Sequence, residues 1–314
     1  MKLRIATRRS PLALWQAEHV AARVRAELGA EVELLAMTTT GDQLVGASLA
    51  KVGGKGLFLK ELERALEEGR ADLAVHSMKD VPVSLAPQFD IAAVLERADP
   101  HDAFISARHA RFEDLPPGAR VGTSSLRRQC QIKALRPDVE VVPVRGNVET
   151  RLRKLDEGLY DAIILAMAGL ERLGLIDRVR ARLSPEVSLP AIGQGAIGIE
   201  CRSDDAELRA QLRTLEHPPT RACINAERAL NEGLGGSCVA PIAGFAQITR
   251  IAAASRPHGE LRLRGLVGDP QGRRILRGER AGAVAEARAI GLALAAELES
   301  QGASELLAAA ETQA

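Results

Sequence analysis

The stretch Val121-Gly-Thr-Ser-Ser-Leu-Arg-Arg-Gln129 decides the fold, because it places a hydroxyl-rich turn and two arginines between a short strand and a helix. Ser125 is a favourable N-cap residue for a helix predicted over residues 126–135. A similar unit opens the chain, where Ile5-Ala-Thr-Arg-Arg-Ser-Pro-Leu-Ala13 leads from a strand into a helix that runs to about residue 28. The repeated unit predicts two similar α/β lobes.

Strand and helix patterns alternate behind both units, which predicts parallel or mixed sheets covered by helices. Such sheets bind ligands at the carboxyl ends of their strands. The last third of the chain predicts a small α+β domain, entered through a plausible linker at residues 217–219. The predicted strands cover residues 3–6, 32–37, 71–76, 120–122, 139–144, 160–166, 242–248, 261–266 and 274–279, and the further helices cover 57–68, 148–157, 169–173, 220–231 and a long stretch from about 283.

Composition excludes several classes of protein. The 314 residues are 46% hydrophobic and carry a formal net charge of +1 with few aromatic residues, which argues for two or three globular domains and against nucleic-acid or membrane-surface binding. No transmembrane or targeting segment is visible, so we expect a cytoplasmic protein. The four cysteines form no CxxC pattern, which argues against a zinc site or a disulfide framework; they are Cys130, Cys201, Cys223 and Cys238.

Positive charge is concentrated in the second lobe, where residues 121–155 include eight basic and three acidic side chains. Arg127 and Arg128 fall in the first turn of a helix, where the macrodipole disfavours cations unless an anion joins them. Arg8 and Arg9 occupy the matching position in the first lobe. The pattern predicts a cleft for a polyanion, with a solvated basic face as the alternative for any single arginine.

Three further features are candidates for chemistry. Asp80 follows a strand predicted to be buried, so it is either a catalytic carboxylate or a turn aspartate. The Gly-rich segment 51–56 lacks the Walker spacing and is either a lid or a surface connection. Cys238 follows Leu234-Gly-Gly-Ser237, where small residues would let a large adduct approach the sulfur, although spacing alone leaves its role open.

Together these motifs resemble the porphobilinogen deaminase family, also called hydroxymethylbilane synthases, along essentially the whole chain. The resemblance implies two lobes like type II periplasmic binding proteins, formed by residues 1–95 with 196–215 and by 100–190, and an α+β domain over 218–314 that bears the cysteine. Ser237 stands where the family commonly has glycine. The matching stretches are residues 5–13 with 15–16, 50–58, 76–82, 121–129, 145–147, 191–195 and 227–241.

The resemblance also implies a monomeric transferase of tetrapyrrole (haem) biosynthesis. It would condense four porphobilinogen molecules head to tail into linear hydroxymethylbilane and release ammonia at each addition. A dipyrromethane cofactor on Cys238 would prime the chain, and Asp80 would stabilise the azafulvenium cation formed when ammonia leaves. No metal is implied.

Further residues match the family's binding positions. Those implied to bind the cofactor are Ser77, Lys79, Thr123, Ser125, Arg127, Arg128 and Gly146, and those implied to bind the substrate are Arg8, Ser10, Gln16, Lys55, Phe58, Arg145, Arg151, Arg172 and Gln194. A two-lobed small-anion binding protein, or an effector domain of the same shape, is the alternative. The missing signal peptide and helix-turn-helix segment argue against these alternatives, and neither explains Cys238.

Overall fold

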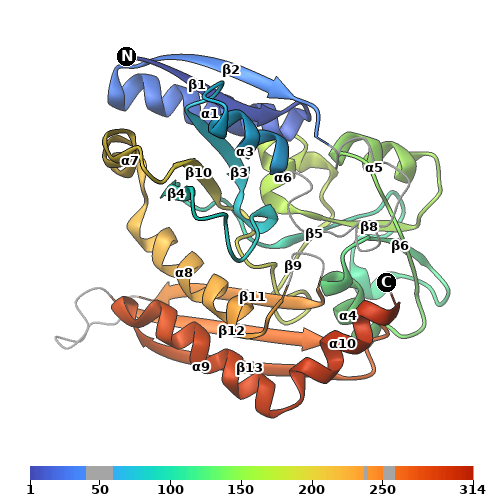
Figure 1. Ribbon diagram of the computed structural model, residues 1–314. Coiled ribbons are helices and arrows are strands. Elements are labelled where there is room, and N and C mark those ends of the chain that lie inside the picture. The colour runs from blue at the N-terminus through green and yellow to red at the C-terminus, as the bar shows by residue number, and fades with distance from the viewer. Residues whose placement is uncertain (40–58, 237–239, 250–258, 314) are drawn as a thin grey trace.

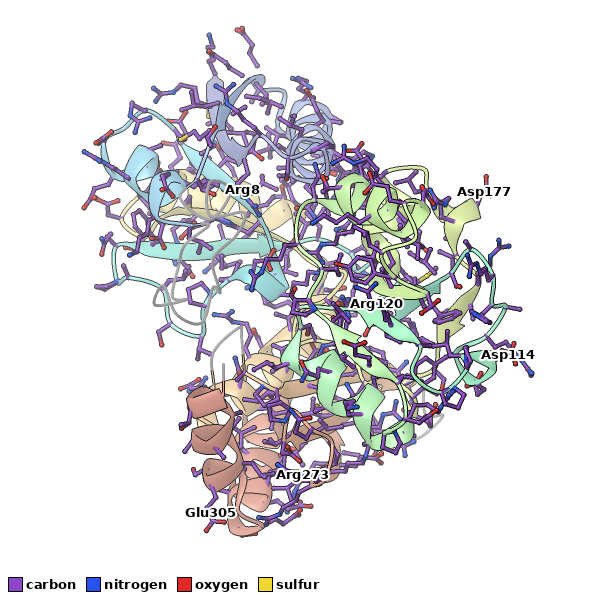
Figure 2. All side chains as sticks on the ribbon, turned by 90° about the vertical axis from the view of Figure 1, so that its right-hand side faces the viewer. Arg8, Asp114, Arg120, Asp177, Arg273 and Glu305 are labelled. Carbon is purple, nitrogen blue, oxygen red and sulfur yellow. The ribbon has the colours of Figure 1, made fainter. Side chains whose placement is uncertain are left out.

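The computed structural model describes residues 1–39, 59–236, 240–249 and 259–313. They form three parts, two built on five-stranded sheets and one on a three-stranded sheet (Figure 1). Figure 2 marks the first part by Arg8, the second by Asp114, Arg120 and Asp177, and the third by Arg273 and Glu305. No helix among these described residues is long and apolar enough to span a membrane.

The first lobe has the strand order β2-β1-β3-β10-β4, in which β10 runs antiparallel to both of its neighbours. Helix α1 packs on one face of the sheet and α3 on the other. Its elements are β1 (Lys2–Arg8), α1 (Pro11–Leu28), β2 (Glu31–Met37), α3 (Lys60–Glu67), β3 (Leu73–Ser77), the 3-10 turn η1 (Met78–Asp80), β4 (Phe89–Val94), β10 (Ile197–Arg202), α7 (Ala206–Leu212) and η4 (Arg213–Leu215).

The second lobe repeats this topology with the order β7-β6-β8-β5-β9. Its antiparallel strand, β5, precedes the other strands of the lobe in the chain, whereas β10 follows the other strands of the first lobe. Its elements are β5 (Asp102–Ile105), η2 (Phe112–Asp114), β6 (Arg120–Gly122), α4 (Leu126–Leu135), β7 (Glu140–Val142), α5 (Val148–Asp156), β8 (Ala162–Ala166), α6 (Met167–Arg172), η3 (Ile176–Arg178) and β9 (Ala181–Leu183). Two lobes of this order form the fold of type II periplasmic binding proteins.

The third part is a three-stranded antiparallel sheet, β11-β12-β13. Helices α8 and α9 pack on each other and on one face, while α4 of the second lobe packs on the other face through Cys130. Its elements are α8 (Pro218–Gly233), β11 (Ile242–Thr249), β12 (Glu260–Gly268), β13 (Ile275–Ala283), η5 (Val284–Glu286), α9 (Ala287–Ser300) and α10 (Ala303–Gln313). The fold class is confirmed, and the exact domain boundaries stay a prediction.

Several elements differ from the sequence-based expectation. Strands β4, β5, β9 and β10 and helix α7 were not predicted. The long C-terminal helix expected from about residue 283 begins only at Ala287, because β13 continues to Ala283. It is also two helices, since Gly302 between them has a φ of 95°, which favours glycine.

Candidate active site

The ends of β1 and β3 bring five predicted residues together in the first lobe. Arg8 ends β1, and Ser10 caps α1 by accepting a hydrogen bond from the backbone N–H of Ala13. Gln16 Nε2, one turn further along α1, donates to Ser77 Oγ over 2.8 Å. These residues and Asp80 line one pocket. Reasoning from the ends of the strands thus predicts which residues of the first lobe lie together.

Asp80 and Lys79 lie in the η1 turn directly after β3, and both side chains are half-buried. Within the described part of the chain, neither the Asp80 carboxylate nor the Lys79 ammonium forms a hydrogen bond or a close ion pair. Burial lowers the pKa of Lys79 to about 8, although the nearby Asp80 acts in the opposite direction. The site thus offers a carboxylate and an ammonium whose hydrogen-bonding capacity is unused.

The backbone around Asp80 is held by two other parts of the molecule. Arg228 of α8 donates to the carbonyl oxygens of Pro82 and Val83, each over 2.8 Å. Gly193 approaches the turn so closely that an added Cβ would lie 2.8 Å from the Met78 carbonyl carbon, and its φ of 74° also favours glycine. These contacts fix the position of Asp80 relative to the third domain and the lobe crossover.

In the second lobe, the predicted turn between β6 and α4 has the expected caps. Ser125 is the N-cap of α4 and accepts a hydrogen bond from the backbone N–H of Arg128. Thr123, which is buried, accepts one from the backbone N–H of Ser125 over 3.2 Å. The turn is therefore rigid where it faces the first lobe.

Asp102 of β5 joins four side chains from distant segments. Its carboxylate accepts hydrogen bonds from Arg127 over 2.9 Å and from Arg128 over 2.7 Å. It also accepts one from Ser188 Oγ over 2.7 Å and one from Gln194 Nε2 over 2.9 Å. Burial alone would raise the pKa of Asp102, but the two guanidinium groups hold this pKa far below its usual range.

This arrangement corrects the expectation for the two arginines. The anion that compensates them at the start of α4 is the internal carboxylate of Asp102, and neither side chain lies on a solvated face, since 4% and 8% of their side-chain surfaces are exposed. The Nε atoms of Arg127 and Arg128 are nevertheless buried without a hydrogen-bond partner. Each arginine thus keeps one donor that the protein does not satisfy.

A second set of cations has no carboxylate partner among the described residues. Arg151 Nε donates to the carbonyl oxygen of Gly146 over 2.8 Å. The Arg145 side chain forms no hydrogen bond or ion pair with a carboxylate of the described residues. Burial, together with the nearby charges of Arg128 and Arg145, lowers the pKa of Arg151 to about 10. Gly146 itself has a φ of 110°, so glycine is favoured at this turn.

Arg172 and Gln194 lie where the chain crosses between the lobes. Arg172 donates to the carbonyl oxygen of Gly195 over 2.7 Å, and burial lowers its pKa to about 10. Gln194 donates to Asp102 and to the carbonyl oxygen of Pro100, while its own Oε1 is buried and without a partner. The structure therefore ties Gln194 to the Asp102 network and leaves Arg172 separate from it.

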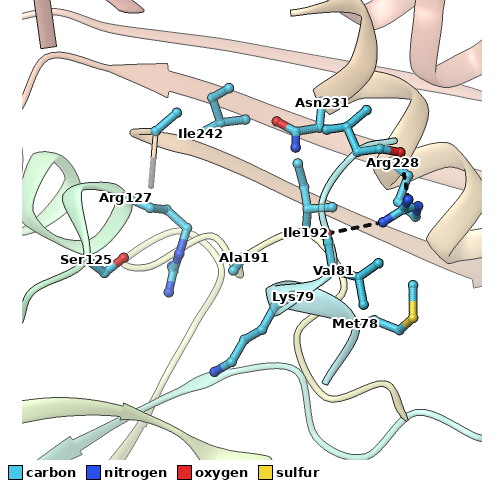
Figure 3. A pocket seen from close by; sticks show the side chains of 12 residues that line it. Met78, Lys79, Val81, Ser125, Arg127, Ala191, Ile192, Arg228, Asn231 and Ile242 are labelled. Atoms are coloured by element: carbon cyan, nitrogen blue, oxygen red, sulfur yellow. Dashed lines mark hydrogen bonds between the residues drawn. The ribbon is translucent and has the colours of Figure 1, made fainter. Parts of the chain in front are cut away.

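A cavity lies where all three parts of the molecule meet (Figure 3). It encloses about 540 Å³, including space open to solvent. Lys79 lines it from the first lobe, Ser125 and Arg127 from the second, and Asn231 and Ala240 from the third. Ala240 is two residues from Cys238, which lies outside the described residues together with Lys55 and Phe58.

Sequence reasoning missed Asp102 and Arg228. Both are charged residues that complete the site from elsewhere in the chain, and no spacing pattern connects them to the residues they contact. Cys130, Cys201 and Cys223 are buried, and burial raises the pKa of each thiol to about 12. Among the described residues, no group of His, Cys, Asp and Glu could hold a metal ion.

Two family models match nearly the whole chain. Residues 3–210 match the model described as "Porphobilinogen deaminase, dipyromethane cofactor binding domain", and residues 221–300 match "Porphobilinogen deaminase, C-terminal domain". The chain belongs to the porphobilinogen deaminase family. It is therefore a transferase of porphyrin biosynthesis, its substrate is a small molecule, and its cofactor is dipyrromethane.

Solved structures of bacterial proteins are also similar to this chain. The VFT2 domain of BvgS from Bordetella pertussis is 16% identical, with 68% of this chain and 86% of that chain covered and a TM-score of 0.41. A putative methionine-binding lipoprotein from Bacillus subtilis is 13% identical, with 69% and 90% covered and a TM-score of 0.43. What each of them binds is a property of that protein.

Proposed function

We propose that this chain condenses four porphobilinogen molecules into linear hydroxymethylbilane with release of ammonia, primed by a dipyrromethane on Cys238. The observation that carries the proposal is the convergence of Lys79, Ser125 and Arg127 on a cavity whose wall includes Ala240, two residues from that cysteine. The binding groups therefore line the same cavity as a residue that is close in the chain to the cysteine to which the cofactor would be attached.

The residues in and near this cavity would suit a dipyrromethane. The cofactor carries several carboxylates and two pyrrole N–H groups. Lys79 and the unsatisfied Nε atoms of Arg127 and Arg128 are donors for the carboxylates, and the Asp80 carboxylate is an acceptor for pyrrole N–H groups. Ser77 ends β3, Thr123 and Ser125 form the turn before α4, and Gly146 lies in the turn before α5. When bound, the group supplies the pyrrole carbon to which the first substrate is joined.

Asp80 is the proposed catalytic residue. When the C–N bond of the protonated aminomethyl group of porphobilinogen breaks, its electron pair leaves with ammonia and the positive charge passes to the substrate's pyrrole. The Asp80 carboxylate would accept a hydrogen bond from the pyrrole N–H and stabilise that charge. After the new C–C bond forms, the same carboxylate would assist the loss of the proton from the attacking ring carbon.

Substrate carboxylates would be bound first by two arginines that form no ion pair with a carboxylate of the described residues. Every porphobilinogen brings one acetate and one propionate, so negative charge grows with each addition. Arg151 and Arg172 have no carboxylate partner among the described residues, and both are desolvated. The full proposed substrate set is Arg8, Ser10, Gln16, Lys55, Phe58, Arg145, Arg151, Arg172 and Gln194.

The cellular setting belongs to the same proposal. We place the enzyme in the cytoplasm as a monomer of the haem pathway, acting on a small molecule without nucleic-acid or membrane partners. The near-neutral net charge of +1 supports this, because neither a polyanion surface nor a membrane would be held by global charge.

The test compares two conservative variants of Asp80. Asp80→Asn keeps the size of the side chain and removes its charge, so turnover of porphobilinogen should fall at least about a hundredfold while the cofactor mass is retained. Asp80→Glu keeps the charge and should retain more activity. Released ammonia and the absorbance of the product measure turnover. Wild-type rates in Asp80→Asn would make Asp80 a structural turn residue.

A further inference from the structure

Trp15 forms a contact between the two lobes that the proposed chemistry does not include. Its ring, on α1 of the first lobe, lies under the guanidinium of Arg172 from α6 of the second lobe, with 5.6 Å between the guanidinium carbon and the ring centroid. On the same helix, His19 stacks on Trp15 with ring centroids 5.1 Å apart and planes within 7°. Arg172, Trp15 and His19 therefore form one stack.

The exposure of Trp15 shows that burial is not the main reason for its position. It is the chain's one tryptophan, and 37% of its surface is exposed. A large aromatic residue gains most of its stabilising energy from full burial, so a half-exposed ring under a cation needs another explanation.

An aromatic ring can hold an arginine without neutralising it. The ring faces the flat side of the guanidinium, and the N–H groups point outward in the guanidinium plane. One of these N–H groups donates to the carbonyl oxygen of Gly195, and no carboxylate in the described part of the chain forms an ion pair with Arg172. A carboxylate in the place of Trp15 would occupy the same N–H edge that an anionic ligand needs.

We propose that Trp15, supported by His19, is a positioning residue that holds Arg172 at the junction of the lobes with its N–H edge available to a substrate carboxylate. This inference rests on the proposed function. The Gly195 carbonyl fixes one end of the guanidinium and the ring fixes its plane, so the cation is oriented before the substrate arrives. Leu12 on the same helix lies close to Gly169 of α6, which keeps α1 and α6 together.

His19 is suited to this stack because it stays neutral at neutral pH. Burial lowers the pKa of His19, and the charges of Arg172 and Arg23 lower it further. A neutral imidazole stacks on the ring without repelling the guanidinium on the other side. Arg172 and Arg23 are the charged groups that act on this imidazole, from α6 and α1 respectively.

The test separates the ring from the rest of the side chain. Trp15→Leu should raise the KM for porphobilinogen about 2- to 30-fold, the range that a cation–π contact corresponds to, with a smaller change in kcat. Trp15→Phe keeps an aromatic face and should stay within about twofold of the wild type. Arg120→Gln is the matched control, because it removes a cation–π contact with Tyr160, 5.9 Å from the ring centroid, outside the site.

Tryptophan fluorescence gives a second readout that does not depend on turnover. Porphobilinogen should change the Trp15 emission of the wild-type holoenzyme, and Arg172→Leu should abolish that change. An unchanged KM in Trp15→Leu, together with an emission that does not respond to porphobilinogen, would overturn the inference. Failure of the proposed function is distinguishable, because the wild-type protein would then release no ammonia.

Discussion

Four arginines of the candidate site fall into two pairs that differ in one respect. Arg127 and Arg128 share the carboxylate of Asp102, whereas Arg151 and Arg172 have no carboxylate partner in the described residues. Arg127 and Arg128 are buried, and Arg151 and Arg172 are half-buried. The comparison teaches that the first pair is largely compensated by the protein itself, while the second pair carries uncompensated charge that an anionic ligand can neutralise.

The largest expected effect comes from breaking the compensated group. Asp102→Asn keeps the shape of the side chain but leaves two buried guanidinium groups without their anion. We expect the free energy of unfolding to fall by about 3–5 kcal/mol in urea denaturation. A loss below about 1 kcal/mol would mean that the Asp102 network does not hold the lobe together, and the comparison would fail.

Substitution in the uncompensated pair, Arg151 and Arg172, should have the opposite effect on stability. Arg151→Leu removes a desolvated cation, so stability should stay the same or rise, while the KM for porphobilinogen should increase about 10- to 100-fold because a charged hydrogen bond to the substrate is lost. Steady-state kinetics and urea denaturation on the same preparation measure both quantities. Destabilisation as large as that of Asp102→Asn would place Arg151 in the structural group.

Lys79 is another cation without a carboxylate partner in the described residues, and the effect of pH on stability tests it. Its pKa of about 8 in the folded protein lies below the ordinary value of 10.5, so between these values the unfolded chain binds a proton that the folded chain does not. Stability should therefore rise with pH across this window by about 1–2 kcal/mol. The cofactor-free Cys238→Ser protein should show this rise, and Lys79→Met in the same background should lack it. Equal slopes in the two proteins would contradict the prediction.

The smallest effect on stability is expected for an exposed ion pair. Arg262 donates to Glu279 across neighbouring strands of the third domain, and 56% and 40% of the two side chains are exposed. Arg262→Gln should change the free energy of unfolding by less than about 1 kcal/mol in the same urea series. A loss as large as that of Asp102→Asn would show that burial is not what separates strong from weak pairs in this protein.

Local sequence signals predicted much of the fold. Ser10 with Pro11, and Ser125, mark the starts of α1 and α4, and alternating patterns located β1 and β6. Strands β5 and β10 were not predicted because each pairs with strands that are distant in the chain, and no turn motif in the neighbouring sequence indicates them. Their positions depend on long-range pairing, which periodicity does not encode.

Local sequence signals likewise predicted only part of the site. Strand-end reasoning brought Arg8, Ser10 and Asp80 together, because parallel strands end at one edge of a sheet. It did not predict the counter-ion of Arg127 and Arg128, which comes from a strand that was not predicted. The roles of Cys238 and of the binding residues come from the family resemblance and remain predictions.

The intact mass of the denatured protein tests the central claim most directly. If a dipyrromethane is covalently bound to Cys238, the wild-type protein should be heavier than its sequence by two linked pyrrole units, and Cys238→Ser should have the mass of its sequence. A fully active wild-type protein with an unmodified mass would contradict the covalent primer.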